Sequence, residues 1–227
     1  MSAQSTLDGA TLVERVTRPA LVGPGPAEPN PLDDITIKDG FYHILQEVAG
    51  KQLNVALNPS APFKPYEIAP PIYPLKLNND PQLTEHTFVF TRQWGVHNGF
   101  TITPKDTPGD PNPAFGCDIR IMGDMVKKPH GDTPGQTQIL LGAFREASYF
   151  TWTVRCDESR TYRQRDGSTK TLYYFRILST VDLGWPDEET AWAPLDYQEH
   201  SLFLVNSDIS SSTDSSQLFQ LVPVSVE

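Results

Sequence analysis

Short runs of alternating apolar and polar residues make up most of the chain from Ile35 onward. The runs are separated by Pro, Gly, Asn and Asp, residues that favour turns for reasons of backbone geometry. Alternation places the apolar side chains of each run on one face of a strand. The pattern therefore predicts an all-β domain built from short strands.

Two strand patterns recur, and each occurs three times. The first is an aromatic residue, a polar residue and Ile, found at 42–44, 100–102 and 175–177. The second is two large apolar residues around one other residue, found at 88–90, 152–154 and 219–221. The two patterns alternate and define approximate units of 40–93, 99–156 and 173–224. This threefold order predicts three copies of one β unit around a shared core, and a closed barrel would leave no exposed sheet edge.

The first 35 residues lack this alternation of apolar and polar positions. Residues 22–31 contain four prolines in ten positions, which is incompatible with a helix or a central strand. Upstream, residues 11–16 are compatible with a short helix or an edge strand. We therefore expect a disordered or loosely docked Pro-rich N-terminal tail over 1–35 and one β domain over 36–227.

Composition narrows the class of protein further. The 227 residues include 21 prolines, and the formal net charge is −10. The prolines argue against long helices, and the acidic balance argues against a nucleic-acid partner, which would need clustered Lys and Arg. No stretch approaches the apolar length of a membrane span. The first residues lack the basic and apolar regions of a signal peptide, so we expect a cytoplasmic protein with no membrane partner.

Catalytic and metal-binding motifs are absent from the sequence. The five histidines form no metal-binding pattern, and no nucleophile elbow or phosphate-binding glycine motif occurs. Cys117 and Cys156 match no metal or redox spacing and are expected to be free thiols packed as small apolar residues. We therefore expect neither an enzyme nor a cofactor.

Charge is unevenly distributed along the last third of the chain. No Lys or Arg follows Arg176, whereas nine acidic residues do. The segment 155–176 contains six basic residues. A solvated surface explains such charges in most proteins, and the alternative is a docking surface that steers a charged partner.

The strand motifs together resemble those of the small fungal β-trefoil protease inhibitors, the mycospin and mycocypin groups. The residues that carry the resemblance are 39–45, 88–90 with 98–102, 152–154 with 174–177, and 218–224. The resemblance covers roughly residues 36–226. It implies a β-trefoil, a six-stranded barrel capped by three hairpins, that has no cofactor. It also implies inhibition of a serine or cysteine endopeptidase through surface loops.

We look for the inhibitory residues in loops that are stiffened by proline, because a stiff loop loses little entropy on binding. They are Asn58, Phe63, Lys64, Lys127 and Lys128. Lys64 lies between Pro62 and Pro65, and a trypsin-like endopeptidase would require such a basic side chain. The sequence does not distinguish which loop is inhibitory or which protease class is bound.

The alternative function is sugar binding by a ricin-B-type lectin, which shares the trefoil fold. Such lectins repeat Gln-x-Trp near the end of each unit, and here only 217–219 approximates that motif. The candidate sugar-binding residues are Trp185 and Trp192, both expected to be exposed, together with Gln217. A trefoil without a dedicated ligand is a third interpretation.

Overall fold

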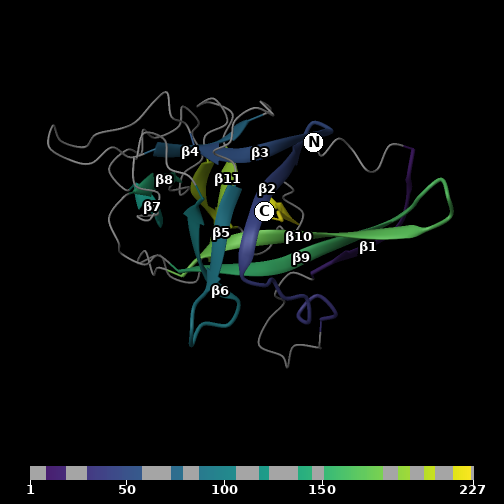
Figure 1. The fold of residues 1–227 in the computed structure, drawn as a ribbon, viewed down its shortest axis with the longest axis horizontal. Helices are drawn as coiled ribbons and strands as arrows, with labels where there is room; N and C mark the ends of the chain where they lie inside the picture. Colours follow the sequence, from purple (N-terminus) through teal and green to yellow (C-terminus); the bar gives the residue numbers. More distant parts are fainter. Residues whose placement is uncertain are drawn as a thin grey trace, which may run out of the picture.

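The structure is a computed structural model. It describes residues 9–18, 30–57, 73–78, 87–105, 118–122, 138–144, 151–180, 189–194, 202–207 and 217–225. These residues form thirteen β-strands joined in one sheet, every pairing is antiparallel, and no α-helix occurs among them (Figure 1). The prediction of an all-β protein is confirmed. Within the same described ranges, no helix is long and apolar enough to cross a membrane.

The strands follow one another in three runs of four after an initial strand. The first strand is β1 (Thr11–Thr17). The first run is β2 (Gly40–Val48), β3 (Lys51–Leu57), β4 (Tyr73–Asn78) and β5 (Thr87–Arg92). The second is β6 (Gly99–Pro104), β7 (Asp118–Met122), β8 (Gln138–Phe144) and β9 (Trp152–Arg163). The third is β10 (Thr169–Ser179), β11 (Glu189–Pro194), β12 (Leu202–Ser207) and β13 (Gln220–Pro223).

The two recurring sequence patterns lie where the three runs begin and end. The first pattern lies in β2, β6 and β10, and the second lies in β5, in β9 and at the start of β13. These strands are neighbours: β2 pairs with β5, β5 with β6, β6 with β9, β9 with β10, and β13 with β2. A bridge between Phe175 and Phe219 connects β10 to the residue that precedes β13.

The pattern residues build the hydrophobic core. Their aromatic and aliphatic side chains belong to one buried cluster, which includes Phe88, Phe90, Phe100, Trp152, Phe175 and Phe219. Phe90 contacts the rings of both Tyr42 and Phe100 edge-on, at centroid distances of 5.0 Å and 6.0 Å. Edge-on contacts of this kind stabilise aromatic pairs beyond the burial of their surface. The alternation in the sequence therefore correctly identified the inward faces of these strands.

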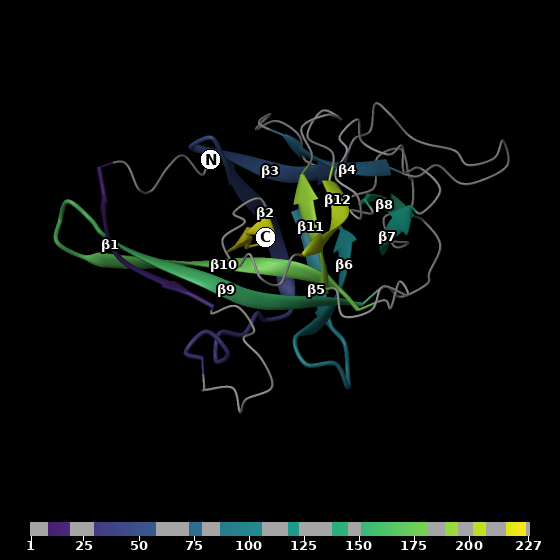
Figure 2. The ribbon, with the colours of Figure 1, turned by 180° about the vertical axis from the view of Figure 1, so that it is seen from behind.

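One hairpin extends well beyond this core. Strands β9 and β10 have twelve and eleven residues, and their far end projects to one side with β1 alongside it (Figures 1 and 2). We call β1 and residues 158–172 of this hairpin the arm. β1 pairs antiparallel with β9 from Thr11 to Thr17, so the edge-strand alternative for residues 11–16 is the one observed. Gly9 has a φ of 76°, and a Cβ atom there would collide with the Arg165 side chain at the tip.

Candidate functional site

Most of the residues that the sequence nominated lie outside the described part of the chain. This holds for all five loop candidates and one tryptophan: Asn58, Phe63, Lys64, Lys127, Lys128 and Trp185. The two remaining candidates, Trp192 and Gln217, are described.

The expectation that Trp192 is exposed is wrong. Its side chain is fully buried, because β11 lies between β10 and β12 and directs the indole into the core. The ring packs edge-on against Trp152 and Phe219, at centroid distances of 5.2 Å and 6.4 Å. Gln217 is also buried. Neither side chain is accessible to a sugar in this structure.

An exposed tryptophan does occur, on the loop between β5 and β6. Trp94 is 101% exposed, and Val96 two residues later is also exposed. The loop projects from the bottom of the molecule in Figure 1. It curls around a recess of about 390 Å³ lined by its own residues, from Arg92 to His97. Trp94 was not among the residues nominated from the sequence, although a signal is present: a Trp-Gly pair at 94–95 that precedes Asn98-Gly99 by two residues.

Hydrogen bonds hold both ends of this loop. At its base, Gln93 N–H donates to the Gly99 carbonyl at 2.8 Å, and Gly99 N–H donates to the Val96 carbonyl at 3.1 Å. The Gln93 side-chain amide donates to Thr101 Oγ1 at 3.2 Å. A neighbouring strand adds a further bond, since Val154 N–H donates to the Asn98 carbonyl at 2.9 Å. The loop is thus fixed to β6 and β9.

The backbone of the loop turns at two positions that favour a left-handed conformation. Gly95 has a φ of 82° and Asn98 a φ of 52°, and Gly and Asn are the residues that adopt such values most readily. Gly99 leaves no room for a side chain, because a Cβ atom there would lie 2.6 Å from Val96. These three residues explain why this short sequence closes into an ordered loop.

The stem of the loop is fixed through Arg92. Its guanidinium donates to the Ile37 carbonyl at 2.7 Å and lies 5.1 Å from the centre of the Phe100 ring. Its backbone N–H donates to Asp39 Oδ1 at 3.1 Å. Arg92 and Asp39 are therefore engaged within the chain.

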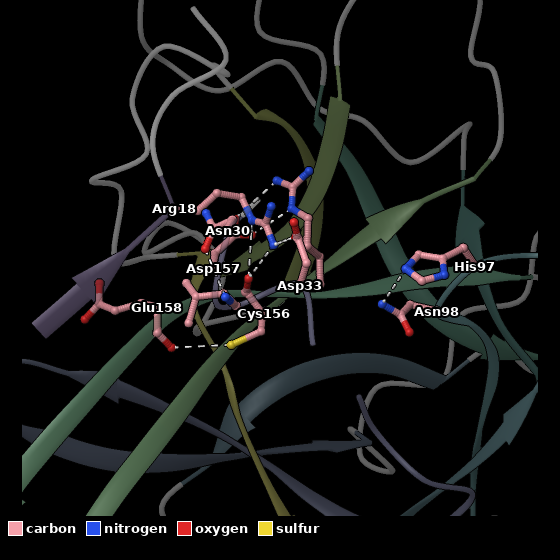
Figure 3. A network of polar contacts seen from close by, with 10 residues as sticks. Arg18, Asn30, Asp33, His97, Asn98, Cys156, Asp157 and Glu158 are labelled. Atoms are coloured by element: carbon pink, nitrogen blue, oxygen red, sulfur yellow. Dashed lines mark hydrogen bonds and ion pairs between the residues drawn. The ribbon is translucent and has the colours of Figure 1, made fainter. Parts of the chain in front are cut away.

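A second polar cluster lies where the arm joins the core, and Figure 3 shows part of it. Asp157 accepts contacts from three guanidinium groups, those of Arg18 at 3.2 Å, Arg155 at 2.7 Å and Arg176 at 3.0 Å. The register of β9 and β10 shifts at this point, because Tyr174 lies opposite Glu158 and Phe175 opposite Cys156. Asp157 is thus the extra residue of a β-bulge, and bulges redirect side chains.

Glu158 forms the other half of this cluster. Its carboxylate is 2% exposed and bonds to both Arg15, at 2.7 Å, and Arg160. Arg160 also reaches Glu47 at 3.3 Å and lies over the Tyr174 ring at 4.2 Å. We call these residues the charged hub: Arg15, Arg18, Asp33, Glu47, Arg155, Asp157, Glu158, Arg160 and Arg176.

The hub has the character of a structural cluster rather than of a binding site. A pocket of about 200 Å³ beside it is lined by Glu47, Arg160 and Tyr174, but both charges there already pair with each other. At the exposed end, the bond from Arg18 holds the pKa of Asp33 below its usual range, and His97 adds a smaller effect. Three of the six basic residues in the 155–176 segment thus pair inside the chain, at positions 155, 160 and 176.

Cys156 is the one cysteine that the structure describes, and it is free and buried as the sequence predicted. Burial raises the pKa of its thiol to about 12. A thiol with this pKa is protonated near neutral pH and is a poor nucleophile. Across the described ranges, no three His, Cys, Asp or Glu side chains gather in a way that could hold a metal ion.

Comparisons with known proteins add little to this geometry. No protein-family model matches the chain, and no curated protein is similar to it. Among solved structures, a Caenorhabditis elegans protein of unknown function matches with a TM-score of 0.46 and 10% sequence identity. The match covers 86% of this chain and 99% of that protein.

Proposed function

We propose that the chain is a β-trefoil. Six strands support this, because the pairings run β2–β5, β5–β6, β6–β9 and β9–β10, and β13 pairs with β2. The bridge between Phe175 and Phe219 links β10 to the residue that precedes β13. The remaining strands of each run form the pairs β3–β4, β7–β8 and β11–β12. These pairs touch one another through β4–β8 and β8–β12. A trefoil consists of six barrel strands and three capping hairpins, and this order of pairing supplies strands in those numbers.

On this fold, the protein acts by binding and inhibits an endopeptidase through its surface loops. The observation that carries this proposal is the loop of residues 93–98, which is hydrogen-bonded at its base and presents an uncovered side chain. An ordered loop loses little conformational entropy when it enters a partner, which is how rigid inhibitors reach high affinity. The resemblance of the strand motifs to the fungal trefoil inhibitors supports an endopeptidase as the partner.

Sugar binding has weaker support. Of the three residues nominated for it, Trp192 and Gln217 are buried. A lectin site would have to be formed by other residues.

The test is a titration of purified protein against endopeptidases of different specificity. The panel contains trypsin-like, chymotrypsin-like and elastase-like serine endopeptidases and a papain-like cysteine endopeptidase. Stoichiometric inhibition of any one of them, with a Kd in the nanomolar range or below that is typical of such complexes, is the expected result. Activity of every enzyme left intact by an excess of the protein would refute the proposed function.

A further inference from the structure

Trp94 differs from the other tryptophans that the structure describes. Trp152 and Trp192 are fully buried and touch each other, whereas Trp94 is wholly exposed. A large aromatic side chain gains no stability from full exposure to water. The folding of this chain therefore does not explain why Trp94 is exposed. Exposed aromatic side chains are typical anchors of protein–protein interfaces.

The surroundings of Trp94 are apolar or already engaged. The loop around it contributes Gly95 and Val96, and the Gln93 amide bonds to Thr101. Two described acidic groups interact with the loop or its stem: Asp39 accepts a bond from the Arg92 backbone, and Asp33, which interacts with His97, accepts one from Arg18. A sugar site would need free carboxylates or amides beside the ring. Binding in an apolar pocket of a partner protein requires only the ring itself. A protein with such a pocket is therefore a better match to Trp94 than a sugar.

We propose that Trp94 is the specificity-determining residue of the inhibitor and enters an apolar pocket of the target that accepts large aromatic side chains. This inference rests on the proposed function and specifies it further. It predicts a target of chymotrypsin-like specificity, whereas Lys64, Lys127 and Lys128 would direct the chain to a trypsin-like enzyme.

The backbone at Trp94 also predicts how the loop resists cleavage. The chain turns immediately after Trp94, at Gly95 with its φ of 82°, and the Gly99-to-Val96 hydrogen bond closes the turn. The Trp94–Gly95 peptide bond is therefore in a turn and not in the extended conformation of a bound substrate strand. We expect the chain to stay intact at this bond during prolonged incubation with the target, as measured by mass spectrometry.

The experiment compares four variants against the same panel of endopeptidases. Trp94→Ala removes the ring, Trp94→Phe keeps a smaller one, and Lys64→Ala removes the competing candidate. The matched control is Tyr173→Ala, which removes another exposed aromatic ring from β10, away from the loop. Because Trp94 contacts none of the core, its variants should unfold at the wild-type temperature, which separates loss of binding from loss of fold.

The expected result is inhibition of the chymotrypsin-like enzyme that Trp94→Ala weakens by about 100-fold and Trp94→Phe by about tenfold or less. Tyr173→Ala and Lys64→Ala should inhibit as the wild type does. If an endopeptidase is inhibited equally by wild type and Trp94→Ala, the role of Trp94 is wrong while the proposed function stands. Inhibition of no endopeptidase overturns both.

Discussion

The core and the charged hub are stabilised by opposite kinds of interaction, although they share strands β9 and β10. In the core, aromatic rings such as Trp152, Trp192 and Phe219 are buried against one another, and their stability comes from apolar surface removed from water. At the hub, Asp157 and Glu158 are buried as charged groups surrounded by five arginines. Burial of charge is tolerated there only because every carboxylate has partners.

This difference between apolar contacts and ion pairs shows how the arm is attached to the rest of the molecule. β1 is exposed along most of its length and contributes little apolar surface to the core. Arg15 and Arg18, on β1 and directly after it, bond to Glu158 and Asp157. Ion pairs thus connect the N-terminal strand to the hairpin, and the core and the arm should respond differently to substitution.

The largest expected effect is at Trp192 in the core. Trp192→Ala removes ring contacts with Trp152 and Phe219 and leaves a cavity, so we expect a loss of about 4 kcal/mol in the free energy of unfolding. The matched control is Trp94→Ala, the same substitution at a fully exposed position, which should change stability by less than about 0.5 kcal/mol. Urea unfolding of both variants measures this difference, and equal losses would contradict the burial of Trp192.

These two tryptophans also show what the sequence was able to predict. The strand patterns identified the inward faces of the strands that carry them, because alternation depends only on neighbouring residues. Trp192 was assigned to the surface since acidic residues and prolines flank it. Its immediate neighbours, Ala191 and Ala193, are small and apolar and form part of β11. The exposure of Trp94 could not be predicted locally, because the exposure of a single side chain depends on the whole fold.

The charged hub could not be predicted from the sequence, for a different reason. Arg18 and Asp157 are separated by 139 positions, and nothing local in the sequence marks them as partners. Their meeting depends on a β-bulge at Asp157 and on the pairing of β1 with β9. From the sequence alone, the basic residues of 155–176 were interpreted as a solvated or docking surface. Half of them are instead partners of two buried carboxylates.

A smaller loss is expected when the hub loses its central charge. Asp157→Asn keeps the shape of the side chain but leaves three arginines without their anion, and Arg176 among them is only 3% exposed. We expect the free energy of unfolding to fall by about 3 kcal/mol. The control is Asp33→Asn, which removes the other carboxylate bound to Arg18 at an exposed position and should cost about 0.5 kcal/mol. Similar values for the two variants in urea unfolding would show that the hub contributes no more than a surface ion pair.

The last effect is absent near neutral pH and develops only in alkali; it concerns Cys156, which lies where the two regions meet. Its side chain belongs to the hydrophobic cluster, and its carbonyl accepts two hydrogen bonds from Arg18, at 3.3 Å and 3.1 Å. In the folded chain its thiol has a pKa of about 12, against 9.0 for an ordinary thiol. The unfolded chain therefore releases this proton first as the pH rises, and ionisation favours unfolding.

The contribution of this thiol to stability is complete below pH 9 and should be lost as the pH rises toward 12, by at most about 1.4 kcal/mol per pH unit. Cys156→Ala removes the group and retains every Tyr and Lys that titrates in the same range. We expect the stability of the wild type to fall more steeply with pH than that of Cys156→Ala, as measured by urea unfolding across this window. If the free energy of unfolding fell equally with pH in the wild type and in Cys156→Ala, the thiol would ionise without opening the core. The junction between the core and the hub would then be looser than the burial of Cys156 indicates.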